Sequence, residues 1–188
     1  MRVITGEAKG RKLKGPPNTS TRPMQDKIKE GLFSALEALD LDIGRVLDLY
    51  SGTGSIGIEA ISRGAAWADL VDHGKAQCAV IKWNLEHTKL ADRAKVHQMP
   101  VSSYLGRLHP PYSLIFLDPP YADPEIRQTL QQIATSALVE SGTIIALGHW
   151  PKFDASAVDP PLVLLRNRCH GDSCFSIFAI DGDQGTNE

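Results

Sequence analysis

From Gly44 onward the chain alternates short apolar, β-rich runs with stretches of helical periodicity, and this alternation constrains the fold most strongly. The expected strands are 45–49, 68–71, 95–98, 113–117 and 143–147. The expected helices between them are about 56–63, 75–90 and 125–137. Two last β-rich runs, 162–168 and 175–180, flank Gly171-Asp172 and predict an antiparallel hairpin. We therefore expect an α/β, three-layer Rossmann-like sheet, mostly parallel with a C-terminal antiparallel hairpin, and helices on both faces.

A basic segment precedes this region. Residues 1–14 have the Gly and Lys/Arg content of a hairpin or extended arm, and a helical pattern follows Pro23 and runs to Asp40. Residues 1–29 carry eight basic and two acidic side chains, whereas residues 30–188 carry twelve basic and twenty acidic ones. We expect a basic N-terminal arm over 1–24, which could face a polyanion such as RNA, and an α/β domain over 25–188. The charge alone fits both a polyanionic partner and a merely solvated hairpin.

The composition excludes several classes of protein. No apolar run approaches the roughly 20 residues of a membrane span, and the six histidines lack metal-ligand spacing. The three cysteines form no C-x-x-C pair, so we expect a cytoplasmic protein without membrane or metal, in which Cys169 and Cys174 face each other as packing residues. His149 is expected in a loop. The tryptophans, which lack the spacing of a base-stacking platform, are expected to pack: Trp67, Trp83 and Trp150.

The loop after the first strand has the glycine spacing of a nucleotide-binding turn. Gly52, Gly54 and Gly57 spell G-x-G-x-x-G, and Asp48 stands four residues ahead of Gly52, where its carboxylate would repel a pyrophosphate. Asp72 ends the second strand, in the place of an acid that accepts the ribose hydroxyls. The arrangement resembles the cofactor loop of class I S-adenosylmethionine methyltransferases. On this loop alone, a capped glycine turn and an NAD site stay open.

The loop after the fourth strand indicates the chemistry. In Asp118-Pro119-Pro120-Tyr121 the two prolines remove N–H donors, so the backbone presents carbonyls beside the Asp118 carboxylate. Such acceptors suit the two hydrogens of an exocyclic amine on a nucleobase, while the Tyr121 ring stacks on the base. The carboxylate also stabilises the positive charge that develops on the nitrogen as the methyl arrives. A strand-ending Pro-Pro turn is the structural alternative.

With both motifs present, the chain resembles the bacterial small-subunit ribosomal RNA guanine-N2 methyltransferase family over nearly its whole length. The stretches that carry the resemblance are Arg2 to Leu13, Thr21-Arg22-Pro23 with Asp26 and Leu32-Phe33, Asp48 to Gly57, Glu59 to Ala65, Asn84-Leu85, Asp118 to Tyr121 and Gly171-Asp172. The resemblance implies methyl transfer from S-adenosylmethionine, with S-adenosylhomocysteine as product and no metal, to a guanine N2 amine on the assembled small subunit.

Four places depart from the family's pattern. Asp72 replaces the family's Glu, and Gly74 stands where the family often has a further acid. Met99-Pro100-Val101 replaces its G-D-A, and Leu147-Gly148-His149 replaces its V-E-H. The change at position 100 removes the acid that would meet the cofactor's adenine amine.

The candidate residues fall into three groups. The predicted catalytic residues are Asp118, Pro119, Pro120 and Tyr121. The predicted cofactor residues are Asp48, Tyr50, Ser51, Gly52, Thr53, Gly54, Asp72, His73 and Val101. The predicted RNA contacts are Lys9, Arg11, Lys12 and Arg22.

The partner expected from the resemblance is the small ribosomal subunit with its 16S RNA, met by a monomer. Three alternatives stay open. One is a DNA or RNA amino-methyltransferase that acts on adenine N6 or cytosine N4. Such an enzyme uses the same D-P-P-Y motif to hold the amine. Another is methylation of a glutamine side-chain amide, which usually has Asn in place of Asp118. The third is a non-catalytic RNA-binding module that keeps the fold.

Overall fold

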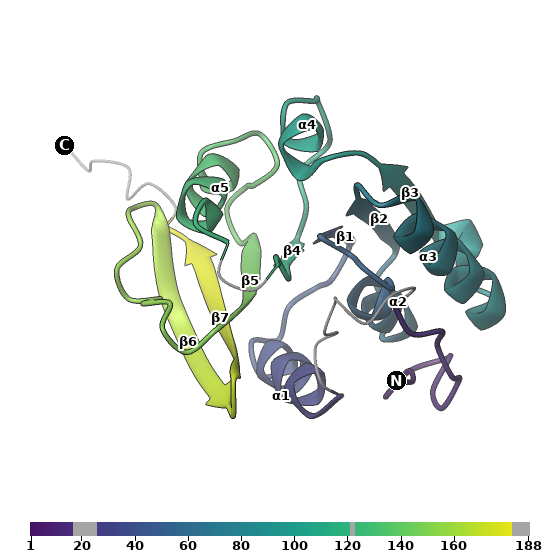
Figure 1. The fold of residues 1–188 in the computed structure, drawn as a ribbon. Coiled ribbons are helices and arrows are strands. Elements are labelled where there is room, and N and C mark those ends of the chain that lie inside the picture. The colour runs from purple at the N-terminus through teal and green to yellow at the C-terminus, as the bar shows by residue number, and fades with distance from the viewer. Residues whose placement is uncertain (17–25, 121–122, 182–188) are drawn as a thin grey trace.

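The predicted alternation builds one seven-stranded sheet in the computed structural model, which describes residues 1–16, 26–120 and 123–181 (Figure 1). The strands are β1 Arg45–Leu49, β2 Trp67–Asp72, β3 Ala94–Gln98, β4 Leu114–Leu117, β5 Ile144–His149, β6 Leu162–His170 and β7 Ser173–Ile180. Their order across the sheet is β3-β2-β1-β4-β5-β7-β6. The first five strands pair in parallel, and β7 pairs antiparallel with both β5 and β6. The expected mostly parallel sheet with a C-terminal hairpin is confirmed.

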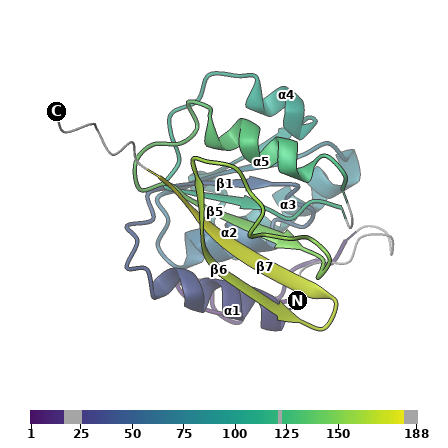
Figure 2. The same ribbon diagram turned by 90° about the vertical axis from the view of Figure 1, so that its left-hand side faces the viewer.

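Helices cover both faces of the sheet. They are α1 Asp26–Glu37, α2 Ser55–Ser62, α3 Lys75–Thr88, α4 Val101–Leu105 and α5 Ile126–Ala134, with a 3-10 turn at Ala91–Arg93. The buried residues of α1, α2 and α3 belong to one core cluster and those of α4 and α5 to another, so the sheet separates two layers of helices (Figure 2). The sequence did not predict α4, because five residues are too few to show a helical period.

The central strands are apolar because helices cover them on both sides. All four residues of β4 are buried, as are residues 46–49 of β1. In the part of the chain that the structure describes, no helix combines the length and the apolar character needed to cross a membrane.

The basic N-terminal segment is folded onto the body. Arg2 and Lys12 form an antiparallel bridge, which makes residues 2–12 a small hairpin-like turn. The apolar side chains of Val3, Ala8 and Leu13 are buried in the same core cluster as α1, α2 and α3. The division of the chain at residue 24 stays a prediction, since residues 17–25 lie outside the described residues.

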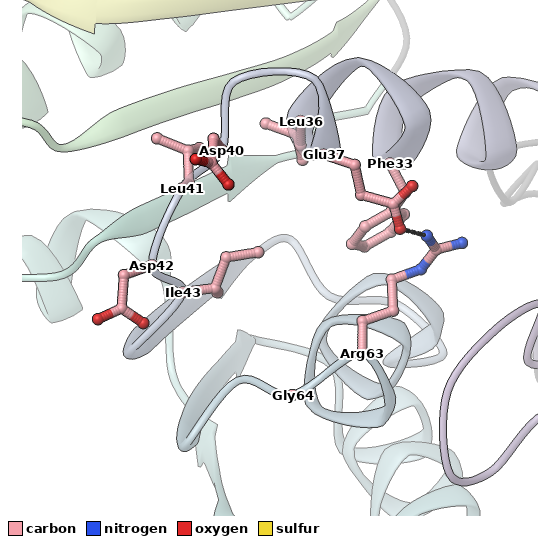
Figure 3. A pocket seen from close by; sticks show the side chains of 9 residues that line it. All are labelled: Phe33, Leu36, Glu37, Asp40, Leu41, Asp42, Ile43, Arg63 and Gly64. Carbon is pink, nitrogen blue, oxygen red and sulfur yellow. Dashed lines mark hydrogen bonds and ion pairs between the residues drawn. The ribbon is translucent and has the colours of Figure 1, made fainter.

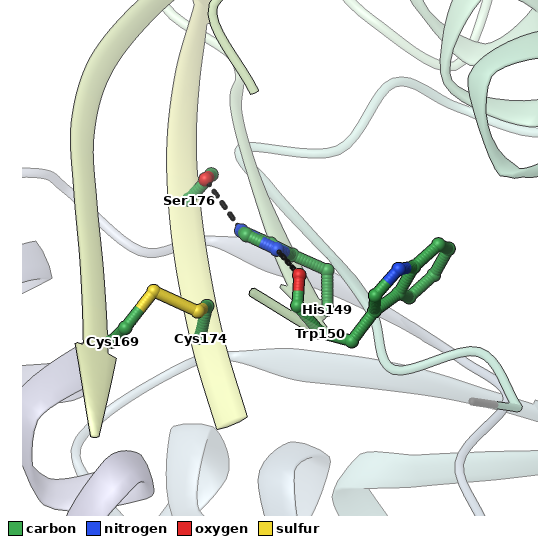
Figure 4. Close-up of a disulfide and its surroundings, with 5 residues drawn as sticks. All are labelled: His149, Trp150, Cys169, Cys174 and Ser176. Carbon is green, nitrogen blue, oxygen red and sulfur yellow. Dashed lines mark hydrogen bonds between the residues drawn. A yellow bond between two sulfur atoms is a disulfide. The ribbon is translucent and has the colours of Figure 1, made fainter. Parts of the chain in front are cut away.

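Two sequence expectations about the C-terminal region are wrong (Figure 4). Cys169 and Cys174 do face each other, but as a disulfide rather than as two packing thiols; they are directly paired across the β6–β7 hairpin with Cα atoms 4.0 Å apart. His149 is the buried last residue of β5 rather than a loop residue. Its Nδ1 lies 2.9 Å from the Trp150 carbonyl and its Nε2 2.8 Å from Ser176 Oγ. Since a carbonyl only accepts, Nδ1 carries the proton and the Ser176 hydroxyl donates to Nε2.

Candidate active site

The strand order reverses between β1 and β4, and the predicted site residues gather at the carboxyl ends of these strands. From β1 the chain proceeds to β2 and β3 on one side, whereas β4 and β5 extend the sheet on the other. The register pairs Leu49 with Leu117 and with Val71, so the loops after β1, β2 and β4 start at one level. A ligand of such a sheet binds in the crevice at this switch point.

The loop after β1 has a backbone that ordinary side chains tolerate poorly. Tyr50 has a φ of 58°, and Gly52 and Gly54 have φ values of 57° and 75°. A left-handed conformation costs a bulky residue about 1–3 kcal/mol. The Tyr50 side chain, half-buried, hydrogen-bonds that of Thr129 on α5, which helps to hold the turn. The loop is therefore a strained turn, and the side-chain contact of Tyr50 with α5 helps to fix its start.

Asp48 is the most unusual group in this loop. Its side chain is 1% exposed, and its Oδ2 accepts the N–H of Gly57 in the first turn of α2 at 2.9 Å. A Cβ on Gly57 would lie 3.0 Å from that oxygen, so the glycine lets α2 approach the carboxylate. Asp48 Oδ1 is buried without a hydrogen-bond partner. Burial raises the pKa of Asp48 to about 7, and the nearby carboxylates of Asp118 and Asp72 add to the increase.

The free oxygen favours a ligand-binding role for Asp48 over a role as a turn cap alone. A carboxylate that served only as a turn cap would have both oxygens satisfied, because an unpaired buried polar atom costs about 1–3 kcal/mol. Three mutually repelling carboxylates at one sheet edge instead suit a ligand that brings positive charge. The residues present thus fit a cationic cofactor such as S-adenosylmethionine.

Asp72 supports the same loop from β2. Its Oδ2 accepts the N–H of Gly52 at 2.9 Å and its Oδ1 that of Gly74 at 2.8 Å. Each carboxylate oxygen can accept a second hydrogen bond, so the predicted contact to ribose hydroxyls stays compatible with this geometry. At 8% exposure, Asp72 also reaches the surface of the crevice.

The other predicted cofactor residues serve the loop in different ways. The Ser51 hydroxyl donates to the Asp48 carbonyl at 2.5 Å and lies 3.2 Å from the Val71 carbonyl, so it holds the turn closed. Thr53 is buried, and its carbonyl accepts a hydrogen bond from Asn84 at 2.9 Å. Their roles in cofactor binding stay predictions.

The expected adenine side of the site involves His73, Val101 and Pro100. The His73 side chain is 79% exposed and lies 3.9 Å from Asp72 Oδ1. Val101 is 8% exposed at the start of α4, directly after the exposed Pro100. A proline offers no side-chain acceptor here, so recognition of an adenine amine falls to backbone carbonyls or is absent.

Asp118 lies beside this loop at the end of β4. Its backbone N–H donates to the Leu49 carbonyl at 3.4 Å, which aligns it with the start of the glycine turn. Desolvation raises the pKa of its partly buried carboxyl group to about 6. Pro119 is partly exposed and Pro120 exposed, so this backbone, which lacks two N–H donors, is accessible. Tyr121, the predicted stacking residue, lies outside the described residues.

The predicted RNA contacts lie on the N-terminal segment. Lys9 and Lys12 are exposed, whereas Arg11 donates from Nη1 to the His87 carbonyl on α3 at 2.8 Å. Arg22 lies outside the described residues. The structure thus places three of the four predicted basic residues on one folded segment.

Two buried polar residues that fasten this segment had no role assigned from the sequence. Glu59 on α2 is 0% exposed and accepts the backbone N–H groups of Ile4 at 2.8 Å and Thr5 at 2.9 Å. Its other partners are Arg63 at 2.9 Å and Lys29 at 3.4 Å. Asn84 on α3, also 0% exposed, hydrogen-bonds both polar groups of the Lys14 backbone and the Thr53 carbonyl.

A signal for these two residues was present in the sequence. Each is a polar side chain on a helical face that is otherwise buried. Glu59 lies three residues after Ile56 and three before Ser62, and Asn84 lies three residues after Ile81 and four before Thr88. A buried polar side chain needs partners, so each predicted a contact from elsewhere in the chain.

A pocket of about 350 Å³ lies near the amino end of β1, away from the carboxyl ends of the strands (Figure 3). The residues that line it are Phe33, Leu36, Glu37, Asp40, Leu41, Asp42, Ile43, Arg63 and Gly64. They come from the end of α1, the loop before β1 and the end of α2, away from Asp48 and Asp118. Arg63, which projects into this pocket, is already paired with Glu37 and Glu59. We therefore place the chemistry at the carboxyl edge. Within residues 1–16, 26–120 and 123–181, no cluster of three His, Cys, Asp or Glu has the arrangement of a metal site.

Comparison with known proteins identifies the family of this chain. A sequence profile of the family described as "Conserved hypothetical protein 95" matches residues 1–179. A Bacillus subtilis (strain 168) protein described as "Putative rRNA methyltransferase YlbH" is 34% identical over 185 residues, which are 97% of this chain and 100% of that protein. "Ribosomal RNA small subunit methyltransferase D" of Escherichia coli (strain K12) is 31% identical over 145 residues, which are 77% of this chain and 72% of that protein. The solved structure "Putative methyltransferase yhhF from Escherichia coli" superimposes with a TM-score of 0.85 at 27% identity, covering 96% of this chain and 98% of that one.

Proposed function

This chain belongs to the Conserved hypothetical protein 95 family, and we propose that it transfers a methyl group from S-adenosylmethionine to the exocyclic N2 amine of a guanine in small-subunit ribosomal RNA. The observation that carries the proposal is the meeting of two buried or partly buried acids at the switch point. Asp48 has a free oxygen there, and Asp118 is followed by two prolines. The names of the relatives from B. subtilis and E. coli support ribosomal RNA as the substrate.

The cofactor side of the site is built by the loop after β1. Asp48, with one oxygen held by Gly57 and the other free, offers negative charge to a cationic ligand. Asp72 orients the loop through Gly52 and offers its remaining lone pairs to ribose hydroxyls. When bound, S-adenosylmethionine supplies an electrophilic methyl group on a sulfonium and leaves as S-adenosylhomocysteine.

The base side of the site is built by the loop after β4. The Asp118 carboxylate and the Pro119 carbonyl accept the two hydrogens of the guanine amine, which turns the nitrogen lone pair toward the methyl group. As the N–C bond forms, the nitrogen becomes cationic, and the Asp118 carboxylate stabilises that charge. The proton leaves the nitrogen after the methyl group has arrived. Tyr121 is the proposed stacking surface for the base.

The remaining expectations belong to the same proposal. The small ribosomal subunit is the proposed partner, because Lys9, Arg11 and Lys12 lie on one folded basic segment and the E. coli relative is named for that subunit. We further propose that the enzyme acts as a cytoplasmic monomer on assembled subunits.

The experiment that tests the proposal measures methyl transfer from labelled S-adenosylmethionine to small subunits from cells that lack this enzyme. Naked ribosomal RNA, DNA and large subunits are assayed in parallel, and an Asp118→Ala variant serves as the inactive control. Label in N2-methylguanine from the small subunit is the expected result. Label in adenine N6 or cytosine N4 would contradict the proposed guanine substrate, while the proposed methyl transfer to an exocyclic amine would still hold. Bound cofactor with no label anywhere would favour a non-catalytic RNA-binding module.

A further inference from the structure

The basic N-terminal segment continues onto the outer face of α3. In the sequence, the basic residues near position 12 and those near position 80 belong to separate regions. In the structure they are adjacent, because Lys14 lies with its Nζ 4.2 Å from the centre of the Trp83 ring. Arg11 reaches the carbonyl of His87, one turn further along the same helix.

The junction between segment and helix is rigid. Asn84 accepts the Lys14 backbone N–H at 2.8 Å and donates to the Lys14 carbonyl at 3.2 Å, so both polar groups of this residue are fixed. The Trp83 ring, 38% exposed, stacks on His87 with ring centres 4.7 Å apart and an interplanar angle of 13°. Trp83 therefore packs as expected, but on the surface, where it positions a lysine side chain.

The exposed face of α3 carries the same sign of charge as the segment. Lys75 and Lys82 are both exposed and lie seven residues apart, which places them on one side of the helix about 10 Å from each other. Glu86 is the one acidic residue of α3. Glu86 is exposed one turn after Lys82, so the face keeps a net positive charge, whereas residues 30–188 together carry twenty acidic and twelve basic side chains.

The N-terminal end of this α3 face lies near the candidate active site. Lys75 follows Asp72 by three residues, and Asn84 joins the Lys14 backbone to the Thr53 carbonyl in the glycine loop. β2, which ends at Asp72, is separated from β4, which precedes Asp118, only by β1. Two strand spacings of about 4.8 Å put these strand ends roughly 10 Å apart.

We propose that Lys75 and Lys82 on α3, with Lys14 held beside Trp83, bind the phosphate backbone of the RNA whose base enters the active site. The inference rests on the proposed RNA substrate and names a surface beyond the N-terminal residues. Phosphate is the ligand that matches an exposed row of lysines, and a rigid surface binds it at a lower cost in conformational entropy than a free arm would.

The test compares two double variants with the same change of net charge. Lys75→Gln/Lys82→Gln removes two charges from α3, and Arg166→Gln/Arg168→Gln removes two from β6, at the opposite edge of the sheet. Binding to a fragment of small-subunit RNA and the KM for small subunits are measured at several salt concentrations. Cofactor affinity without RNA, which should stay within about twofold, checks the fold of both variants.

The α3 variant should weaken RNA binding by about 3–10-fold at 100 mM salt, and it should flatten the slope of log K against log salt by about 1.5, since each phosphate contact contributes about 0.7–0.9. The β6 variant should leave both quantities nearly unchanged. Equal losses in the two variants would show a general effect of net charge and overturn the proposal. Unchanged binding in both would overturn it as well. If the wild type itself neither binds nor methylates RNA, the proposed function fails, and that outcome is distinct from a loss of the α3 effect alone.

Discussion

Glu59 and Asp48 are both fully buried acids near α2, yet their surroundings are opposite. Glu59 accepts two backbone N–H groups and pairs with Arg63 and Lys29. Asp48 accepts one backbone N–H, keeps one oxygen unpaired and sits near two further carboxylates. The contrast separates a structural acid, whose partners are all in the chain, from one whose free oxygen is available to the proposed ligand.

The largest expected effect follows from removing the structural acid. Glu59→Ala leaves the buried Lys29 ammonium and two backbone N–H groups without their acceptor, so we expect a loss of about 3–5 kcal/mol in the free energy of unfolding. Urea unfolding measures this loss. Glu140→Ala, an exposed acid, is the matched control and should change stability by less than about 0.5 kcal/mol. A loss below about 1 kcal/mol for Glu59→Ala would remove the distinction between the two acids.

Removing the acid on the base side should affect the reaction and leave cofactor binding largely intact. For Asp118→Ala we expect at least a hundredfold lower methyl transfer, about 2.7 kcal/mol or more, because a developing positive charge loses its counter-charge. Cofactor affinity, measured by calorimetry, should stay within about threefold of wild type. The exposed Asp159→Ala serves as control. Parallel loss of cofactor binding and transfer would contradict the role given to Asp118.

Removing the ligand-facing acid should stabilise the free protein. Because the folded state holds the pKa of Asp48 at about 7, above its ordinary 3.8, the folded state binds the proton more tightly and wild-type stability falls as pH rises through this interval. Asp48→Asn keeps an oxygen for Gly57 without the charge. At pH 8 we expect a gain of about 1–2 kcal/mol, or roughly 2–8 °C in Tm, together with lost cofactor binding.

Thermal unfolding at pH 8 and pH 5 tests this sign. At pH 5 the carboxyl group is protonated in the folded wild type but still ionised in the unfolded chain, whose pKa is the ordinary 3.8, so the advantage of Asp48→Asn should be smaller than at pH 8 without vanishing. An advantage of equal size at both pH values would show that charge at Asp48 is not its cause.

The smallest expected effect is the pH dependence of cofactor binding by the wild type. A cationic ligand favours the ionised carboxylate, so below pH 7 binding must also remove a proton from Asp48. Affinity should therefore fall by up to tenfold, about 1.4 kcal/mol, for each pH unit below that value. Titration at pH 5.5, 6.5 and 7.5 measures it, and an affinity that rises as pH falls would contradict the predicted contact.

Much of the fold and of the site could be predicted from local patterns. The strands and the longer helices follow from periodicity, and the resemblance based on motifs is confirmed by the family profile and by the relatives' sequences. The predictions of a packing thiol at Cys169 and of a loop position for His149 were wrong. The disulfide and the buried imidazole depend on the register of β7 against β6 and β5, which the sequence does not show. α4 was missed for its shortness.

The sequence by itself determined which loops are candidates for function, since Asp48 and Asp118 stand at the ends of apolar strands in an α/β alternation. Only the tertiary structure decided what those groups lack and what surrounds them. The free oxygen of Asp48 and the contact of Asn84 with Lys14, 70 residues earlier, became visible only there. The physical reason is range: periodicity and turn chemistry act over a few residues, whereas hydrogen-bond satisfaction is settled by partners far apart in the chain.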